Sequence, residues 1–156
     1  MFDLYYKIMT YLQIFLIVIS IASLVLTILM LTAEWKLFSK AGEQGWKALI
    51  PFYNTYVQCK ICWKPNAFWA YFVFMILTGV TTGQFSGFPF YIWVASLIGM
   101  SVVSAMMSYY VSLSYGHGLG YAIGLLLLPW LFVMILGFGS SKYVGPMGIS
   151  QEKAGQ

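Results

Sequence analysis

Residues 35–54 read W-K-L-F-S-K-A-G-E-Q-G-W-K-A-L-I-P-F-Y-N, the one long stretch of the chain that is neither plainly apolar nor loop-like. Lysines are interspersed in it with aromatic side chains. Tryptophan and lysine both favour the boundary between water and lipid, because the apolar part of each side chain lies in the lipid while its polar end stays in water. The stretch therefore predicts a segment at a membrane surface, flanked by membrane-spanning helices.

The composition of the whole chain agrees with a membrane protein. Of its 156 residues, 61% are hydrophobic and only 8% are charged, whereas a soluble domain carries about 25% charged residues. Such a chain cannot cover a globule with polar surface, so lipid must be its solvent. The formal net charge is +4, and five of the eight lysines lie between the first two apolar runs: Lys36, Lys40, Lys47, Lys60 and Lys64. This charge is too small and too localised to indicate nucleic-acid binding, and it fits a membrane surface.

The apolar runs predict an all-α fold, an integral membrane helical bundle. Four transmembrane helices are expected at about 11–33, 67–82, 90–113 and 119–138. The first run is too long for a signal peptide and lacks a cleavage pattern, so it should remain as a span. Residues 1–140 would form a single transmembrane domain, followed by a polar C-terminal tail over 141–156.

An interfacial loop over 35–65 should fold as an amphipathic helical hairpin between the first and second spans. Gly42 suits the left-handed position that ends a helix, and Pro51 would close the short helix that follows. Lysines are denser after the first span than before it, so the positive-inside rule places the N-terminus outside and this loop in the cytoplasm. With four spans the tail exits on the N-terminal side, which leaves five lysines inside and three outside.

Small residues in the third and fourth spans predict close helix packing, because they let backbones approach and hydroxyls bridge helices. The expected packing residues are Ser96, Gly99, Ser104, Ser108, Gly116, Gly120 and Gly124. The third span carries a row of serines, Ser96, Ser104, Ser108 and Ser112. This serine row should face the polar side of the first span, formed by Gln13, Ser20, Ser23 and Thr27. A water-filled groove is the alternative, but no charged residue lies inside any predicted span. Pro129 should bend the fourth span midway.

The loop that follows the first span holds the residues predicted to form an interaction surface. They are Trp35, Lys36, Lys40, Gly42, Gly45, Trp46, Lys47, Pro51, Tyr53 and Asn54. The two glycines are predicted at turns, Pro51 at a helix end, and the three lysines on one side of the loop. A generic membrane anchor needs only aromatic residues and lysines near the interface. Two interpretations stay open: a docking surface for a partner or lipid headgroups, or an anchor that sets depth and tilt.

A C-x-x-C pair, Cys59 and Cys62, lies after Asn54 in the same interfacial loop, and His117 lies in a later loop on the same predicted side. These three are weak candidates for a metal site. Zinc needs four ligands and a redox pair needs a thioredoxin-like setting, and the sequence contains neither. Packing cysteines are the favoured interpretation, and no metal or cofactor is expected.

The pattern W-K-x-F-x-K-A-G-x-x-G-W-x-A-x-I-P-x-Y-N over 35–54 resembles the signature of an uncharacterised family of small, multi-spanning bacterial membrane proteins. The later stretches 115–120 and 137–146 are similar to the usual ending of that family. A similar module precedes the catalytic part of some bacterial type I signal peptidases, but this chain lacks a structured serine–lysine site. The resemblance implies a multi-pass protein of the bacterial plasma membrane and no particular activity.

The function expected from the sequence is that of a non-enzymatic membrane accessory or interaction protein. Its partners would be the lipid bilayer and another membrane protein or a second copy of itself, and nucleic acid is not expected. The alternative is a small channel or transporter, which would act as an oligomer. A membrane enzyme or a metal-binding protein comes third, since no nucleophile, base and acid are grouped in the sequence.

Overall fold

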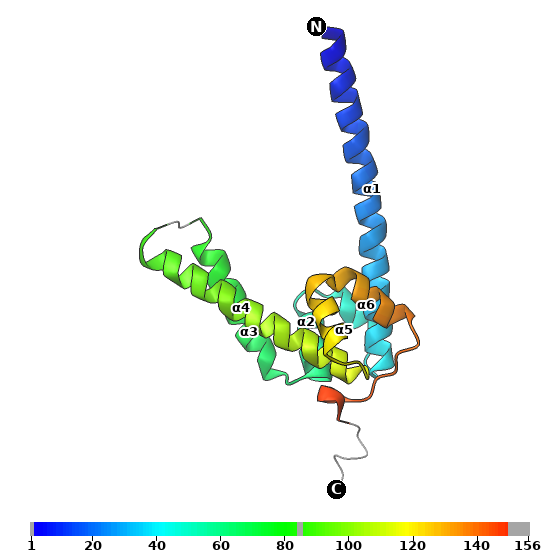
Figure 1. Ribbon diagram of the computed structural model, residues 1–156, viewed down its shortest axis with the longest axis vertical. Helices are drawn as coiled ribbons and strands as arrows, with labels where there is room; N and C mark the ends of the chain where they lie inside the picture. Colours follow the sequence, from blue (N-terminus) through cyan, green and yellow to red (C-terminus); the bar gives the residue numbers. More distant parts are fainter. Residues whose placement is uncertain (1, 84–85, 150–156) are drawn as a thin grey trace.

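The computed structural model describes residues 2–83 and 86–149, and this part of the chain contains helices and no strand (Figure 1). Its elements are α1 (Phe2–Lys40), η1 (Gly45–Leu49), α2 (Tyr53–Cys62), α3 (Asn66–Thr81), α4 (Gly87–Ser114), α5 (Leu119–Leu127), α6 (Pro129–Phe138) and η2 (Pro146–Gly148). The predicted all-α class is confirmed. Two helices, α1 and α4, are long and apolar enough to cross a membrane.

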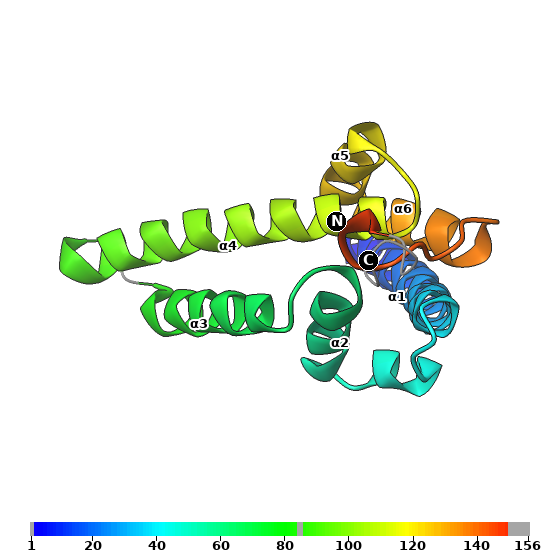
Figure 2. The same ribbon diagram turned by 90° about the horizontal axis from the view of Figure 1, so that it is seen from below.

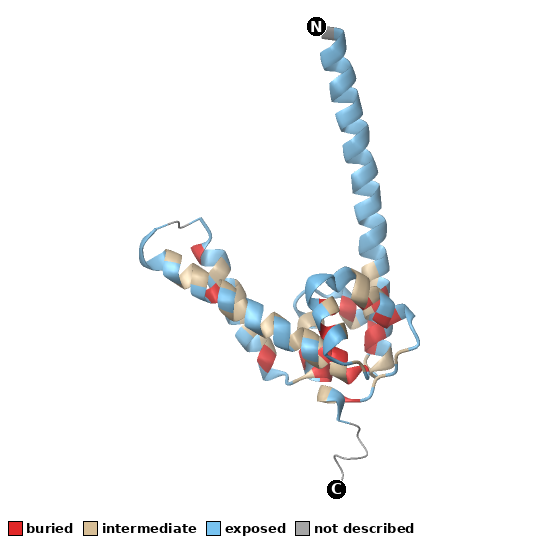
Figure 3. Ribbon diagram, in the orientation of Figure 1, coloured by how far each residue is buried: buried red, intermediate tan, exposed pale blue. Residues whose placement is uncertain are grey.

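One end of the molecule is a packed unit, called the base here, made of the end of α1, η1, α2, the end of α4, α5, α6 and η2. Helix α1 and the α3–α4 pair extend away from it in Figure 1, and Figure 2 shows the α3–α4 pair from below. Most buried residues lie in the base (Figure 3). Its core consists of Ala33, Leu37, Phe38, Ala48, Val57, Ile61, Cys62, Val111, Tyr115, Leu125, Val133 and Leu136.

Helix α1 is longer than the span predicted at 11–33 and runs without interruption to Lys40. It contains neither glycine nor proline, so nothing in its sequence breaks the helix. Residues 3–29 are exposed, and the later part packs on α6 and η1. Gly42 ends the helix as predicted: its φ is +79°, and the next amide, of Glu43, donates to the Phe38 carbonyl over 2.9 Å. This is the hydrogen bond of a Schellman cap.

Helices α3 and α4 form an antiparallel pair whose ends lie within a few residues of the predicted boundaries 67–82 and 90–113. The two helices have the most extensive contact in the molecule. Thr78 Oγ1 donates to Ser96 Oγ over 3.0 Å. A Cβ on Gly99 would lie 2.6 Å from the Phe74 ring, so that ring packs directly on the backbone of α4.

The prediction of one continuous helix over 119–138 is wrong. Leu128 leaves helical geometry, with φ −133° and ψ 62°, and Pro129 begins α6 as a separate helix. Proline has no N–H and its ring clashes with the preceding turn, so the helix breaks here rather than bending. Helices α5 and α6 pack on each other, and beyond their outer ends His117 Nε2 lies 2.8 Å from Ser141 Oγ. A straight helix of this length would hold its ends about 30 Å apart. The segment is therefore a helical hairpin whose two ends lie together.

The predicted contact between α1 and the serine row of α4 is also not formed. Helix α1 packs on α6 and η1, whereas α4 packs on α2, α3, α5 and η2. The Ser20, Ser23 and Thr27 hydroxyls each donate to a carbonyl of α1 itself, over 2.8–2.9 Å. These groups are satisfied within their own helix, so they do not require a neighbouring helix.

Candidate functional site: a polar cavity in the base

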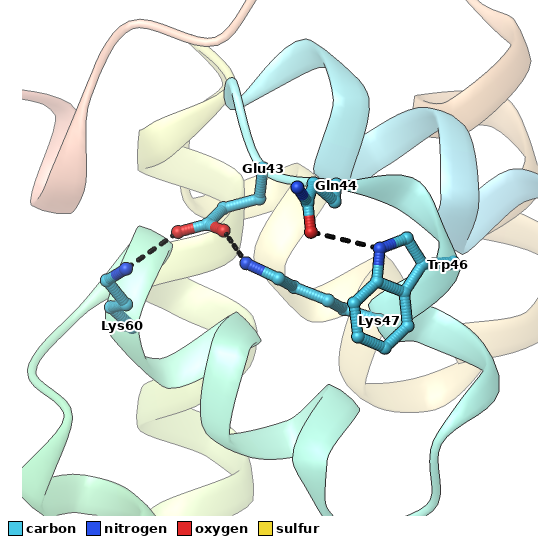
Figure 4. A network of polar contacts seen from close by, with 5 residues as sticks. All are labelled: Glu43, Gln44, Trp46, Lys47 and Lys60. Atoms are coloured by element: carbon cyan, nitrogen blue, oxygen red, sulfur yellow. Dashed lines mark hydrogen bonds and ion pairs between the residues drawn. The ribbon is translucent and has the colours of Figure 1, made fainter.

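Glu43 joins two parts of the interfacial loop, η1 and α2 (Figure 4). Its carboxylate accepts a hydrogen bond from Lys47 Nζ at 2.5 Å and another from Lys60 Nζ at 2.7 Å. Beside this cluster, Trp46 Nε1 donates to Gln44 Oε1 over 2.9 Å. The bonds from Lys47 and Lys60 hold the pKa of Glu43 below its usual range, since both favour the charged form. Lys47 is therefore an internal partner of Glu43.

Lys40 has a different internal partner, the end of α6. Its Nζ donates to the carbonyls of Leu136 and Gly139 over 2.6 and 2.8 Å. The last carbonyls of a helix have no donors within the helix, and they attract a cation. Lys36 also contacts the end of α6: its Nζ lies 4.6 Å from the centre of the ring of Phe138, the last residue of that helix. The three lysines predicted on one side of the loop thus all contact other parts of the base.

Close packing explains further residues of the loop. A Cβ on Gly45 would lie 2.3 Å from the Trp35 ring, so only glycine fits there. Pro51 follows Ile50, the residue that caps the end of η1, in agreement with its predicted place at a helix end. Trp46 and Tyr53 are largely exposed, by 45% and 40%. Packing and turn geometry thus explain why these residues occur at these positions of the loop. The role of the loop as an interaction surface stays a prediction.

Asn54, the last residue of the loop pattern, holds an acidic side chain of α1. Its Nδ2 donates to Glu34 Oε2 over 2.9 Å, and its Oδ1 accepts from Thr55 Oγ1 over 3.1 Å. Glu34 is half-buried. Within residues 2–83 and 86–149, no lysine or histidine nitrogen lies within 4.0 Å of its carboxylate. The chain therefore orients a carboxylate without giving it a counter-charge.

Glu34 lines a cavity of about 270 Å³ at the meeting point of the helices. The lining residues are Met30, Glu34, Thr55, Gln58, Cys59, Tyr71, Ser104, Met107, Ser108, Val111, Leu125, Pro129 and Val133. The break between α5 and α6 forms part of the wall. Because Pro129 has no N–H, the Leu125 carbonyl lacks its usual helical donor. The cavity thus combines one carboxylate, several uncharged polar groups and an apolar wall.

A family model, described as a family of unknown function (DUF5684), matches residues 46–146. The chain belongs to the DUF5684 family. The DUF5684 match runs from η1 to the start of η2 and includes every wall of the cavity except the one formed by α1. A search of the curated proteins found no match, and neither did a search of the solved structures.

Cys59 and Cys62, both in the DUF5684 region, are buried and are not disulfide-bonded. Burial raises the pKa of Cys59 to about 11 and that of Cys62 to about 12, so both are neutral thiols at physiological pH. Cys59 Sγ lies 4.0 Å from Met107 Sδ at the cavity wall. His117 stacks on Tyr121, with ring centres 4.3 Å apart. Within the described residues, the two cysteines and His117 do not come together as a set of three ligands.

The predicted packing residues of the DUF5684 region have different environments. Ser96 and Gly99 contact α3, as described above. A Cβ on Gly124 would lie 2.2 Å from the Phe132 ring, so this glycine lets α6 fold back onto α5. Gly116 forms the turn before α5, with φ +77°, and Gly120 faces open space. The three glycines therefore do not share one helix face, because Gly116 precedes α5.

Ser104 and Ser108 line the cavity rather than a helix interface. Ser108 Oγ donates to the Ser104 carbonyl over 3.0 Å. The location of Ser104 and Ser108 at a cavity agrees better with the alternative interpretation of the serine row, a water-filled groove, than with helix packing.

Sequence reasoning missed Glu34, Thr55, Gln58 and Tyr71 as cavity residues. Glu34 lies one residue past the predicted first span and 20 residues before its partner Asn54, so no local pattern connects them. One signal was available: Glu34 is one of only four acidic residues in a chain of 156, and the loop pattern ends in an asparagine.

Proposed function

We propose that the protein is a multi-pass membrane protein that crosses the bilayer three times, through α1, α3 and α4, with α5–α6 as a re-entrant hairpin. The 2.8 Å contact between His117 and Ser141 supports this, because it holds the two ends of the hairpin together. Broken helices occur at membrane depth where protein buries them or where they line a polar cavity. The break between α5 and α6 meets that requirement through Pro129, which lines the cavity.

The distribution of lysines favours the same topology. With three crossings, seven of the eight lysines lie on the side of the interfacial loop, and only Lys7 lies on the other side. That asymmetry is stronger than the five against three expected for four spans. By the positive-inside rule the base then faces the cytoplasm of a bacterial cell, and α1 begins outside.

Within that membrane we infer a non-enzymatic accessory or interaction protein that binds another membrane-spanning helix through α1. The exposure of residues 3–29 carries this proposal. Gln13 lies in this exposed part, and its amide has no hydrogen-bond partner among the described residues. In hydrocarbon an unpaired amide is costly, so a polar group on a partner helix would stabilise it. The resemblance of the interfacial loop to a module that precedes some signal peptidases agrees with an accessory role.

Site-specific crosslinking in native membranes tests the proposed interaction. Single cysteines at Ser20 or Thr27, on the face of Gln13, would carry a photoactivatable group in a variant with Cys59→Ser and Cys62→Ser. We expect protein adducts from these two positions and only lipid adducts from Val18 or Leu29 on the opposite face. An adduct of twice 17.6 kDa would identify a second copy as the partner. Equal yields from both faces would reject α1 as an interaction surface.

A small channel or transporter is the second candidate, and the cavity favours it. Broken helices beside a polar cavity are the usual setting for solute and ion sites in transporters. Solute flux across liposomes that contain the purified protein would support this candidate. Stable partner adducts without flux would favour the accessory role.

A further inference from the structure

We propose that the cavity of the base is a binding site for a small organic cation, a primary alkylammonium, with Glu34 as its charge partner. The site is formed by the base together with Tyr71 of α3. The proposal does not depend on what α1 contacts or on whether the protein transports a solute.

The negative charge of Glu34 indicates that the cavity binds a cation. Asn54 Nδ2 fixes Glu34 Oε2 at 2.9 Å, while Glu34 Oε1 has no partner in the described part of the chain. A half-buried carboxylate without a counter-charge is unfavourable, and a bound cation would remove that cost. The C-terminal end of α5 also lies at this wall, through Leu125, and the negative end of a helix dipole favours a cation.

The size and the wall of the cavity decide which kind of cation fits. Its 270 Å³ is the volume of about nine water molecules, so a ligand of several heavy atoms can enter. A bare metal ion instead needs about six or more oxygen ligands at about 2.4 Å, as calcium does. Here Val111, Leu125 and Val133 form apolar wall. An alkyl chain would pack on that wall while its ammonium group contacts Glu34.

Further polar groups are available to the ammonium group. Gln58, Tyr71 and Ser104 line the cavity, and their side-chain polar atoms make no hydrogen bond to another described residue. None of these atoms is fully buried and unsatisfied, which agrees with a cavity open to solvent. An ammonium group donates three hydrogen bonds, so Glu34 and two of these oxygens would satisfy it.

Binding of n-butylammonium to the full-length protein in detergent micelles tests the proposal. We expect saturable binding by isothermal titration calorimetry and no saturable binding of butan-1-ol, which has nearly the same shape without the charge. Glu34→Gln should weaken butylammonium binding at least about tenfold, because its amide keeps the shape and removes the charge. Asp3→Asn removes an exposed acid far from the cavity and should bind like wild type.

A second pair of variants keeps the test valid if Glu34→Gln fails to fold. Ser108→Leu fills the cavity without changing its charge and should also abolish binding. Ser101→Leu adds the same side chain to α4 outside this cavity and should leave binding unchanged. The proposal is overturned if Ser108→Leu or a folded Glu34→Gln binds like wild type, or if butylammonium does not bind. Displacement of butylammonium by an equal concentration of sodium would overturn the assignment to an organic cation.

Discussion

At the scale of single residues, Glu43 shows how charged side chains hold the interfacial loop to the base. Its carboxylate bridges Lys47 and Lys60, and it is only 16% exposed. The two lysines lower its pKa. The stabilisation is therefore present above the pKa that Glu43 has in the unfolded chain, and it is lost as the pH falls through the lower pKa of the folded state.

We expect Glu43→Gln to lower the free energy of unfolding at pH 7 by about 1 kcal/mol, because the amide is uncharged and has one accepting oxygen, so that one of the two lysines loses its acceptor. The difference from wild type should shrink as the pH falls and disappear below the lowered pKa of folded Glu43, where protonation neutralises Glu43 in both states of the wild type. Chemical unfolding in detergent at pH 7 and at a series of acidic pH values measures it. Asp3→Asn is the control, since Asp3 is 93% exposed and 3.9 Å from Lys7. A difference between Glu43→Gln and wild type that is unchanged in acid would show that the ion pairs are not its cause.

The role of a residue could be predicted from the sequence where local backbone geometry determines it. The role could not be predicted where the residue contacts a distant part of the chain. Gly42 ends α1 because a left-handed residue is needed there, which the flanking sequence indicates. Lys40 was predicted on a wet side of the loop, but it binds the end of α6 almost 100 residues later. Glu34 was overlooked for the same reason. The residues of the cavity come from every helix, so no single stretch of sequence contains the site.

At the scale of elements, α1 and α6 approach each other at Ala33 and Gly137. A Cβ on Gly137 would lie 2.6 Å from the Ala33 carbonyl oxygen. The helices therefore touch through backbone atoms, and only glycine permits this spacing. The sequence predicts close packing at other glycines but not at Gly137, because the tertiary fold determines which residue a glycine contacts.

The matched variants Gly137→Ala and Gly120→Ala test this contact. Alanine favours a helix over glycine by up to about 1 kcal/mol, and Gly120 has open space around it, so Gly120→Ala should raise the unfolding temperature slightly. Gly137→Ala should lower it, because overpacking a close contact costs about 1–3 kcal/mol. Thermal unfolding in detergent measures both. An equal effect of the two substitutions would mean that α1 and α6 are not in backbone contact.

The boundaries of α3 and α4 could be predicted because long apolar runs between breakers define them. The break in the fourth segment could be predicted only as a bend at Pro129. Its size depends on contacts that the local sequence does not contain, namely Phe132 on Gly124 and His117 beside Ser141. These contacts turn an expected span into a hairpin.

In the whole molecule, the side of the base from which each segment leaves determines the number of membrane crossings. Helix α1 and the tip of the α3–α4 pair extend away from the base, while the chain after α6 returns to it (Figure 1). The Val144 amide donates to the Ser114 carbonyl over 2.8 Å, which fixes that return beside the end of α4. Three crossings therefore predict that the interfacial loop and the segment after α6 share one side of the membrane.

Cysteine labelling at three positions measures this most directly. Single cysteines replace Gln44, Ser86 or Ile149 in the variant with Cys59→Ser and Cys62→Ser, and intact cells are treated with a membrane-impermeant thiol reagent. Three crossings predict that Ser86→Cys is labelled in intact cells, whereas Gln44→Cys and Ile149→Cys are labelled only after permeabilisation. Labelling of Ile149→Cys together with Ser86→Cys in intact cells would contradict the re-entrant hairpin and restore a fourth span.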